Sequence, residues 1–137
     1  MRVLLDTNIL IDYISMRTSF TDDAQAILKL CMEKKIDGCI AAQSVMNAFY
    51  ILRKELTAHE RRNVLTRICN LLTVVGIDKR KILSALANDD FTDVEDCLQT
   101  ECAKEFSADY IVTRNVKDFQ YSTIPAISPN EFLKKVI

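Results

Sequence analysis

Three aspartates in separate stretches of the chain are placed so that one fold could bring them together. Asp6 follows the apolar run of residues 2–5, Asp118 comes shortly after the apolar run of residues 109–113, and Asp96 lies in the first turns of a predicted helix. In open α/β sheets, ligand sites form at the carboxyl ends of the strands. Carboxylates gathered there repel one another unless some are protonated or a cation lies between them. All-oxygen sites suit Mg²⁺ or Mn²⁺, so metal-dependent cleavage of phosphodiesters is the leading hypothesis.

Each of these stretches also has a purely structural interpretation. Asp6 is a residue type that begins turns and caps helices, and Asp118 is compatible with a side-chain-stabilised turn. In the third stretch, Thr92 and Glu95 have the spacing of a capping box, and Asp93 suits the positive end of a helix. The metal hypothesis therefore depends on three individually weak signals that agree on one edge of one sheet.

Short apolar runs alternate with helical patterns along the chain. The predicted strands are residues 2–5, 38–42, 73–77 and 109–113, with 124–127 as a possible fifth. The predicted helices are residues 21–35, 44–56, 57–72, 78–88, 92–106 and 128–137, with Thr21 and Thr57 as N-caps and Glu60 completing a capping box with Thr57. This order predicts an α/β fold, a three-layer α/β/α sandwich around a mainly parallel four- or five-stranded sheet. We expect residues 1–137 to form a single domain.

Composition excludes several classes of function. With only two glycines, the chain has no glycine-rich phosphate-binding loop, and a net charge of −1 confines any contact with phosphates to a local patch. His59 is the only histidine, so neither a Ser/Cys–His triad nor a histidine-rich metal site is expected. The five cysteines form no CxxC pair and no signal peptide is recognisable, which indicates reduced thiols and a cytoplasmic location. No apolar run is long enough to cross a membrane.

The stretches "LLDTNIL" and "DVEDCLQTECAKEFSADYIVTRNVKDF", with the order of elements between them, resemble the PIN-domain family. These are small metal-dependent nucleases that include VapC-type toxins, and the resemblance covers essentially the whole chain. It implies the same three-layer fold, an RNA substrate and one or two Mg²⁺ or Mn²⁺ ions. It also implies homodimers, and an antitoxin partner where the protein is a toxin.

By position, Asp6, Asp96 and Asp118 match three of the four acids that the family uses to hold metal. Asn115 matches a polar accessory position and is expected among the catalytic residues. The residues expected to contact substrate or to orient carboxylates and water are Asn8, Asp93, Thr113, Arg114 and Lys117. Arg114 and Lys117 in particular could pair with the phosphates of a bound strand.

Asn47 occupies the position of the family's remaining acid. An amide oxygen can still ligate a hard cation, but it contributes no charge. The resemblance therefore predicts lowered metal affinity and weak or absent catalysis, which Asp93 would partly offset.

Two alternatives stand beside the nuclease hypothesis. One is a non-catalytic PIN-like module that binds RNA or a protein. The other is a phosphatase of the haloacid-dehalogenase type, with Asp6 as nucleophile, although that chemistry needs a second carboxylate where this chain has Asn8. Asp12, about one helical turn further along, is interpreted as a solvated surface residue.

Overall fold

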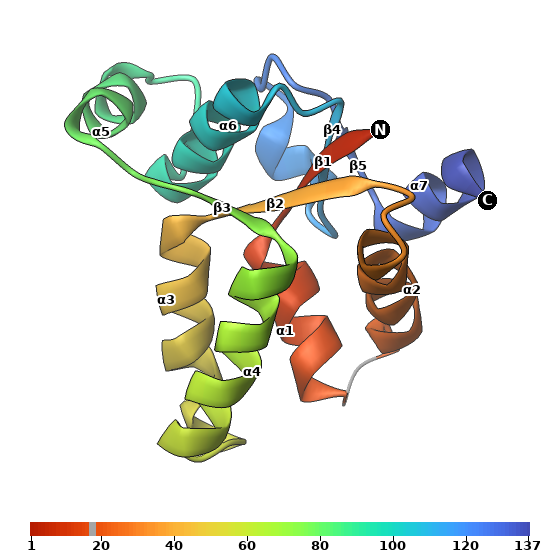
Figure 1. The fold of residues 1–137 in the computed structure, drawn as a ribbon. Coiled ribbons are helices and arrows are strands. Elements are labelled where there is room, and N and C mark those ends of the chain that lie inside the picture. The colour runs from red at the N-terminus through yellow and green to blue at the C-terminus, as the bar shows by residue number, and fades with distance from the viewer. Residues whose placement is uncertain (17–18) are drawn as a thin grey trace.

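The structure is a computed structural model that describes residues 1–16 and 19–137. In this part of the chain, five parallel strands form one sheet in the order β3-β2-β1-β4-β5 (Figure 1). The strands are β1 (Arg2–Leu5), β2 (Asp37–Ala41), β3 (Thr73–Val75), β4 (Tyr110–Val112) and β5 (Ala126–Ile127). Each of them overlaps an apolar run in the sequence, so the predicted parallel sheet is confirmed in its five-stranded form.

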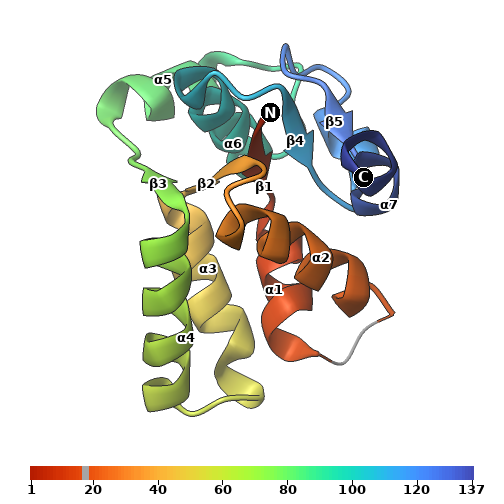
Figure 2. The same cartoon turned by 45° about the vertical axis from the view of Figure 1, so that its right-hand side comes forward.

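Helices cover both faces of this sheet, which confirms the predicted three-layer sandwich (Figures 1 and 2). One face packs against α1 (Thr7–Ser15), α2 (Thr21–Met32), α3 (Ala42–Ile51) with the 3-10 turn η1 (Leu52–Lys54), α4 (Ala58–Leu71) and α7 (Pro129–Val136). The other face packs against α5 (Lys79–Ala87), α6 (Val94–Phe106) and the 3-10 turn η2 (Val116–Phe119). Among the described residues, none of the helices combines the length and the apolar character needed to cross a bilayer.

Two hydrophobic cores follow from the alternation of side chains along the central strand. Val3 and Leu5 of β1 point into the core shared with α1 to α4 and α7, whereas Leu4 points into the core shared with α5 and α6. All three side chains are fully buried. Because successive residues of a strand face opposite sides, a strand covered on both faces must be apolar throughout, as β1 is.

Helix α6 is the element that brings acidic residues to the sheet. It leads into β4, which is parallel to β1, so its N-terminus lies by the carboxyl ends of the strands and its C-terminus by their amino ends. The helix is buried over most of its length beyond the first turn. Its first turn stays accessible, and that turn carries Glu95 and Asp96.

The helix N-termini agree only in part with the predicted caps. The capping box of α4 is confirmed, because Thr57 Oγ1 accepts from the Glu60 N–H at 3.1 Å and Glu60 Oε1 accepts from the Thr57 N–H at 2.9 Å. The prediction that Thr21 caps α2 is wrong: Phe20 occupies the cap position, and Thr21 donates its hydroxyl to the backbone oxygen of Asp12 at 2.9 Å. Thr21 therefore ties α2 to α1 instead of closing its own helix.

The start of α6 also differs from the prediction. Thr92 and Glu95 do not form a capping box. Asp93 is the cap residue, its Oδ1 accepting from the Glu95 N–H at 2.8 Å, and the helix begins at Val94. Asp93 competes successfully because its short carboxylate reaches the backbone N–H two residues on. The side chain of Glu95 is consequently not needed for capping.

Candidate active site

The candidate site lies where the two halves of the sheet diverge. Strand β1 is central: β2 and then β3 lie on one side of it, and β4 and then β5 lie on the other. Such a switch point leaves a crevice at the carboxyl ends of the strands. A cleft of about 470 Å³ occupies this position. Its polar lining comprises Asp6, Thr7, Asn8, Asn47, Asp93, Glu95, Asp96, Gln99, Arg114, Asn115 and Asp118, with Tyr50 at one side.

Asp6 is held rigidly at the end of β1. It is the N-cap of α1, a helix that the sequence analysis did not predict, and its Oδ1 accepts from the Thr7 N–H at 2.6 Å. Oδ1 also accepts from Gln99 Nε2 at 2.8 Å, while Oδ2 accepts from the Thr113 hydroxyl at 2.7 Å and from Asn8 Nδ2 at 3.1 Å. With four donors on a carboxylate that is only 7% exposed, Asp6 has one fixed orientation. Asp6 therefore both caps α1 and lines the cleft.

The acids on the α6 side are in a different situation. Among the described residues, none of the ion pairs involves Asp93, Asp96 or Asp118. Burial, followed by repulsion from Asp93, Asp6, Asp118 and Glu95, raises the pKa of Asp96 to about 7. Near neutral pH this carboxyl group is therefore only partly ionised. The cleft thus holds more negative charge than its own residues neutralise, and a bound cation would relieve that imbalance.

Asn47 and Glu95 meet at the side of the cleft formed by α3. Asn47 Nδ2 donates to Glu95 Oε2 at 3.1 Å, and Gln43 Nε2 donates to the backbone oxygen of Glu95 at 3.3 Å. From the sequence, Glu95 was expected in a capping box and therefore not among the site residues. The signal that could have found it is the neighbouring Asp93, which can cap the helix alone and so releases the longer side chain.

Arg114 lines the cleft, but it is already engaged. Its Nε and Nη2 donate to the two carboxylate oxygens of Asp12 at 2.6 and 3.2 Å, and the guanidinium lies over the ring of Phe20, 4.5 Å from its centroid. The prediction that Asp12 is a solvated surface residue is wrong, because only 1% of it is exposed. Sequence spacing could not show this, since the partner lies far along the chain. A phosphate contact by Arg114 remains a prediction.

The remaining expected residues lie at different depths. Thr113 is fully buried and, besides donating to Asp6, accepts from the Asn115 N–H at 2.9 Å, so it links β4 to the turn that carries Asn115. Lys117 is exposed and does not line the main cleft. It lines an adjoining hollow of about 410 Å³ that shares Asp93, Asp96 and Asp118 with the cleft and adds Gln120 and Tyr121.

Gln99 is a site residue that the sequence analysis missed. It is 3% exposed and its Nε2 donates to Asp6, while within residues 1–16 and 19–137 its buried Oε1 has no hydrogen-bond donor. An unsatisfied buried oxygen is unfavourable, and a cation or its bound water would satisfy it. No motif in the sequence marks Gln99, because its position next to Asp6 exists only once α6 packs across β1.

The donor set fits a hydrated divalent cation. Within residues 1–16 and 19–137, no three Asp, Glu, His or Cys side chains converge as a ready-made set of direct ligands. Mg²⁺ commonly keeps several of its waters and binds through one or two carboxylates. A hydrated cation would be attracted by the excess negative charge, and its water could donate to the unsatisfied Gln99 oxygen. The oxygens of Asp6, in contrast, already accept four hydrogen bonds.

Solved structures of known proteins share this fold. The chain superimposes with a TM-score of 0.68 and 23% identity on a structure described as a toxin–antitoxin complex from Klebsiella pneumoniae, covering 93% of this chain and 97% of that one. VapBC2 from Rickettsia felis, bound to a DNA fragment from its promoter, gives a TM-score of 0.67 at 17% identity, covering 93% and 98%. VapC20 from Mycobacterium tuberculosis, described as a sarcin–ricin loop cleaving toxin, gives 0.62 at 9% identity, covering 80% and 86%.

At these identities, the structural likeness supports the fold alone. No curated protein matches the chain in sequence. The family model described as PIN domain matches residues 2–117, from the start of β1 to the residue before Asp118. The match spans most of the chain, includes β1 to β4 and contains Asp6 and Asp96. The chain therefore belongs to the PIN-domain family.

Proposed function

We propose that this protein is an endoribonuclease that depends on Mg²⁺ or Mn²⁺. The observation that carries the proposal is the gathering of acids from the end of β1, from α6 and from η2 in one cleft, with a pKa of Asp96 raised to about 7. Membership of the PIN-domain family supports it. So does the fold shared with VapC20, a protein described as cleaving the sarcin–ricin loop.

We assign Asp6, Asp96 and Asp118 to holding one or two metal ions, Asp6 through water bound to the ion, because its own oxygens already accept four hydrogen bonds. When bound, such an ion lowers the pKa of a water molecule and stabilises negative charge on the phosphate. The chain's own contribution is to fix Asp6. Thr113 and Asn8 hold Asp6 through hydrogen bonds to its Oδ2. This fixed carboxylate gives the site a rigid side against which substrate and metal can be positioned.

The substrate would run across the cleft and the adjoining hollow. An exposed tyrosine lies at each side: Tyr50 lines the cleft and Tyr121 lines the hollow. Aromatic side chains of this kind stack on unpaired bases. Lys117, in the same hollow as Tyr121, and Arg114 in the cleft supply positive charge for the backbone. We assign Asn115 and Asp93, which border the reactive acids, to orienting water and substrate.

We further propose that the protein is the toxin of a toxin–antitoxin pair, acts in the cytoplasm and forms homodimers. The support is the fold shared with structures described as toxin–antitoxin complexes. Co-expression with the product of an adjacent reading frame, followed by size-exclusion chromatography with light scattering, measures both the partner and the number of copies.

Cleavage of labelled RNA tests the central proposal. We expect the purified protein to cut RNA with Mn²⁺ and to stop when EDTA is added. Asp96→Asn should lower the rate by at least about 100-fold, the upper end of the loss seen when even an indirect partner of a metal is removed. Asp22→Asn, an equivalent change of an exposed acid on α2, is the matched control and should cut normally. Cleavage that persists in EDTA or in Asp96→Asn would contradict the proposal.

A non-catalytic binding module is the second candidate function. It is favoured by the neutral Asn47 in the cleft and by the lack of three converging metal ligands among the described residues. Binding without cleavage, with an affinity that falls steeply with salt, would support this candidate. The phosphatase alternative has less support, because both oxygens of Asp6 are occupied by hydrogen bonds that restrict it as a nucleophile.

A further inference from the structure

The contact between Asn47 and Glu95 joins two helices across the mouth of the cleft. Asn47 Nδ2 on α3 donates to Glu95 Oε2 on α6 at 3.1 Å, and both side chains line the cleft together with Asp6, Asp96 and Asp118. The amide therefore acts here as a donor that holds a carboxylate. The negative charge on this side of the cleft belongs to Glu95, while α3 supplies only the neutral partner.

Glu95 can reach across because the helix start leaves its side chain available. Asp93 caps α6 by accepting from the Glu95 N–H at 2.8 Å, so the backbone of Glu95 is fixed. Gln43 Nε2 donates to the Glu95 backbone oxygen at 3.3 Å, which ties the first turn of α6 to α3. With its backbone held at both polar groups, Glu95 projects from a defined point.

An independent observation on the same helix points to a ligand. Gln99 lies four residues after Glu95, so the two side chains share one face of α6. Gln99 is 3% exposed and lines the same cleft, and no donor in the described part of the chain reaches its Oε1. A carboxylate and an unsatisfied carbonyl oxygen on one helix face next to Asp6 are the kind of oxygens that a hard divalent cation or its water shell binds.

We propose that Glu95 supplies a further carboxylate to the divalent cation in the cleft, and that Asn47 is the residue that positions it. This inference rests on the metal dependence of the proposed function. It replaces the expectation that Asn47 simply lowers metal affinity, because the charge missing from α3 is present on α6. Removing Glu95 should then weaken metal binding more than removing Asn47.

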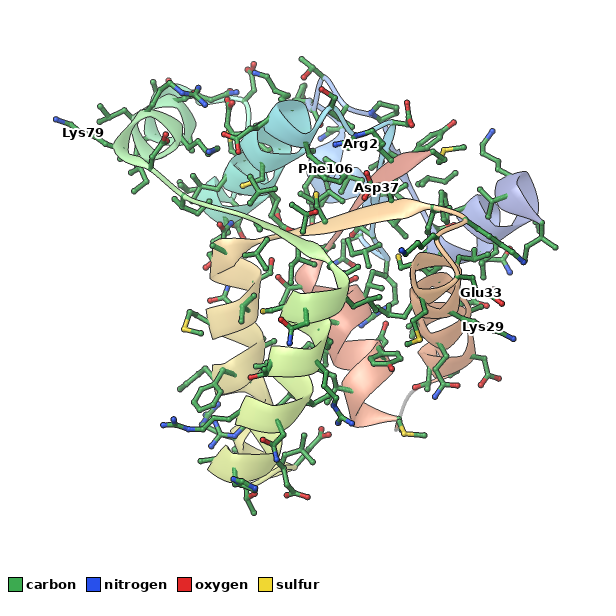
Figure 3. The ribbon with its side chains drawn as sticks, viewed as in Figure 1. Arg2, Lys29, Glu33, Asp37, Lys79 and Phe106 are labelled. Carbon is green, nitrogen blue, oxygen red and sulfur yellow. The ribbon has the colours of Figure 1, made fainter. Side chains whose placement is uncertain are left out.

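Calorimetric titration of the full chain with Mn²⁺ tests this assignment without relying on activity. We expect Glu95→Gln to weaken Mn²⁺ binding by about 10- to 100-fold, and Asn47→Ala to weaken it less. The double variant Asn47→Asp with Glu95→Gln moves the carboxylate back to α3 and should recover much of the affinity. Glu33→Gln is the matched control, because Glu33 is an exposed acid at the C-cap of α2, away from α3 and α6 (Figure 3).

The outcomes separate this inference from the proposed function. If the unchanged protein binds Mn²⁺, Asp96→Asn loses it and Glu95→Gln binds as tightly as Glu33→Gln, then the role of Glu95 is refuted while the metal site stands. If the unchanged protein binds no Mn²⁺, both proposals fail. Loss of affinity in Glu95→Gln with recovery in the double variant would support the assignment, because a purely structural role of Glu95 would not be rescued by a charge on the facing helix.

Discussion

The two edges of the sheet differ in how their charged side chains are arranged. At the amino ends of the strands, Arg2 joins three elements: its Nη1 lies 2.7 Å from Asp37 Oδ2, its Nε donates to the Phe106 backbone oxygen at 2.8 Å, and its guanidinium lies 4.1 Å from the centroid of the Phe106 ring (Figure 3). At the carboxyl ends, Asp93, Glu95, Asp96 and Asp118 line one cleft with Asp6. The amino edge pairs opposite charges, whereas the carboxyl edge collects like charges beside one buried ion pair, Arg114 with Asp12.

The difference separates residues that stabilise the fold from residues that we assign to function. The Arg2 contacts link β1, β2 and α6, and they need nothing outside the chain. At the other edge, burial and then repulsion from the neighbouring acids raise the pKa of Asp96 to about 7, which is an energetic cost to the folded chain. Repulsion between neighbouring carboxylates is expected at functional sites, because a bound cation attracts the same carboxylates that otherwise repel one another.

The largest effect is expected when the ion pair at the acidic edge is broken. Arg114→Met removes the guanidinium from Asp12, whose carboxylate is 1% exposed, and should destabilise the protein by about 3 kcal/mol. Urea unfolding followed by circular dichroism measures the change. Arg67→Met, which alters an exposed arginine on α4, is the control. Equal losses of unfolding free energy in the two variants would show that the buried pair contributes no more to stability than an exposed arginine.

A divalent cation should offset the excess negative charge at the carboxyl edge. Mn²⁺ at 100 times its dissociation constant should stabilise the folded protein by about 2.7 kcal/mol, seen as a rise in Tm. We expect the rise to vanish in Asp96→Asn and to persist in Asp37→Asn, which changes an acid at the opposite edge. A rise that survives in Asp96→Asn would place the cation elsewhere.

The stability of the metal-free protein should depend on pH through Asp96. Its pKa is about 7 in the folded protein, above the ordinary aspartate value of 3.8, so the folded state binds the proton more tightly than the unfolded state. Stability should therefore fall as pH rises from about 4 to about 7. Because Asp96 is only partly buried, its contribution is about 1 kcal/mol after screening by solvent.

Asp96→Asn cannot titrate and checks this pH dependence directly. The variant should lose that part of the slope and should be more stable than the unchanged protein at pH 8, as measured by urea unfolding at a series of pH values. Asp22→Asn should keep the slope. A slope that is unchanged in Asp96→Asn would assign the titration to another group.

The smallest effect is expected at the amino edge. Arg2 and Asp37 form an exposed pair, with side chains 45% and 54% accessible, so Asp37→Asn should cost about 0.5 kcal/mol. High salt should remove even this difference, because it screens exposed charges. Thermal unfolding at two salt concentrations measures it. If Asp37→Asn lost as much unfolding free energy as Arg114→Met, the exposed pair at the amino edge would be no weaker than the buried pair at the carboxyl edge.

The sequence predicted the sheet well because strand formation here depends on local pattern. Apolar runs such as residues 2–5 and 109–113 can be recognised without knowing their neighbours, and their alternation with helices implies a parallel sheet. From that sheet alone, Asp6 and Asp118 were expected at one edge, and both line the observed cleft. That they hold metal remains a prediction.

The errors concern residues whose partners are distant along the chain. Asp12 was interpreted as exposed, yet its partner Arg114 is 102 residues away. Glu95 was assigned to its own helix, yet it contacts Asn47 on α3. Helix α1 was not predicted, although Asp6 caps it. For Asp12 and Glu95 a short-range explanation was available, and only the packing of separate elements displaced it. The omission of α1 is different, because its cap is a neighbouring residue.

The amino-acid sequence by itself determined the order of strands and helices, the parallel sheet and the edge at which acids would collect, because periodicity and strand termination are local properties of the chain. Tertiary structure decided which acids are satisfied and which repel one another. Asp6 receives four hydrogen bonds, Asp12 receives a guanidinium, and Asp96 is left among like charges. The charge state of a carboxylate depends on burial and on neighbours within a few ångströms, and those neighbours exist only after the elements have packed.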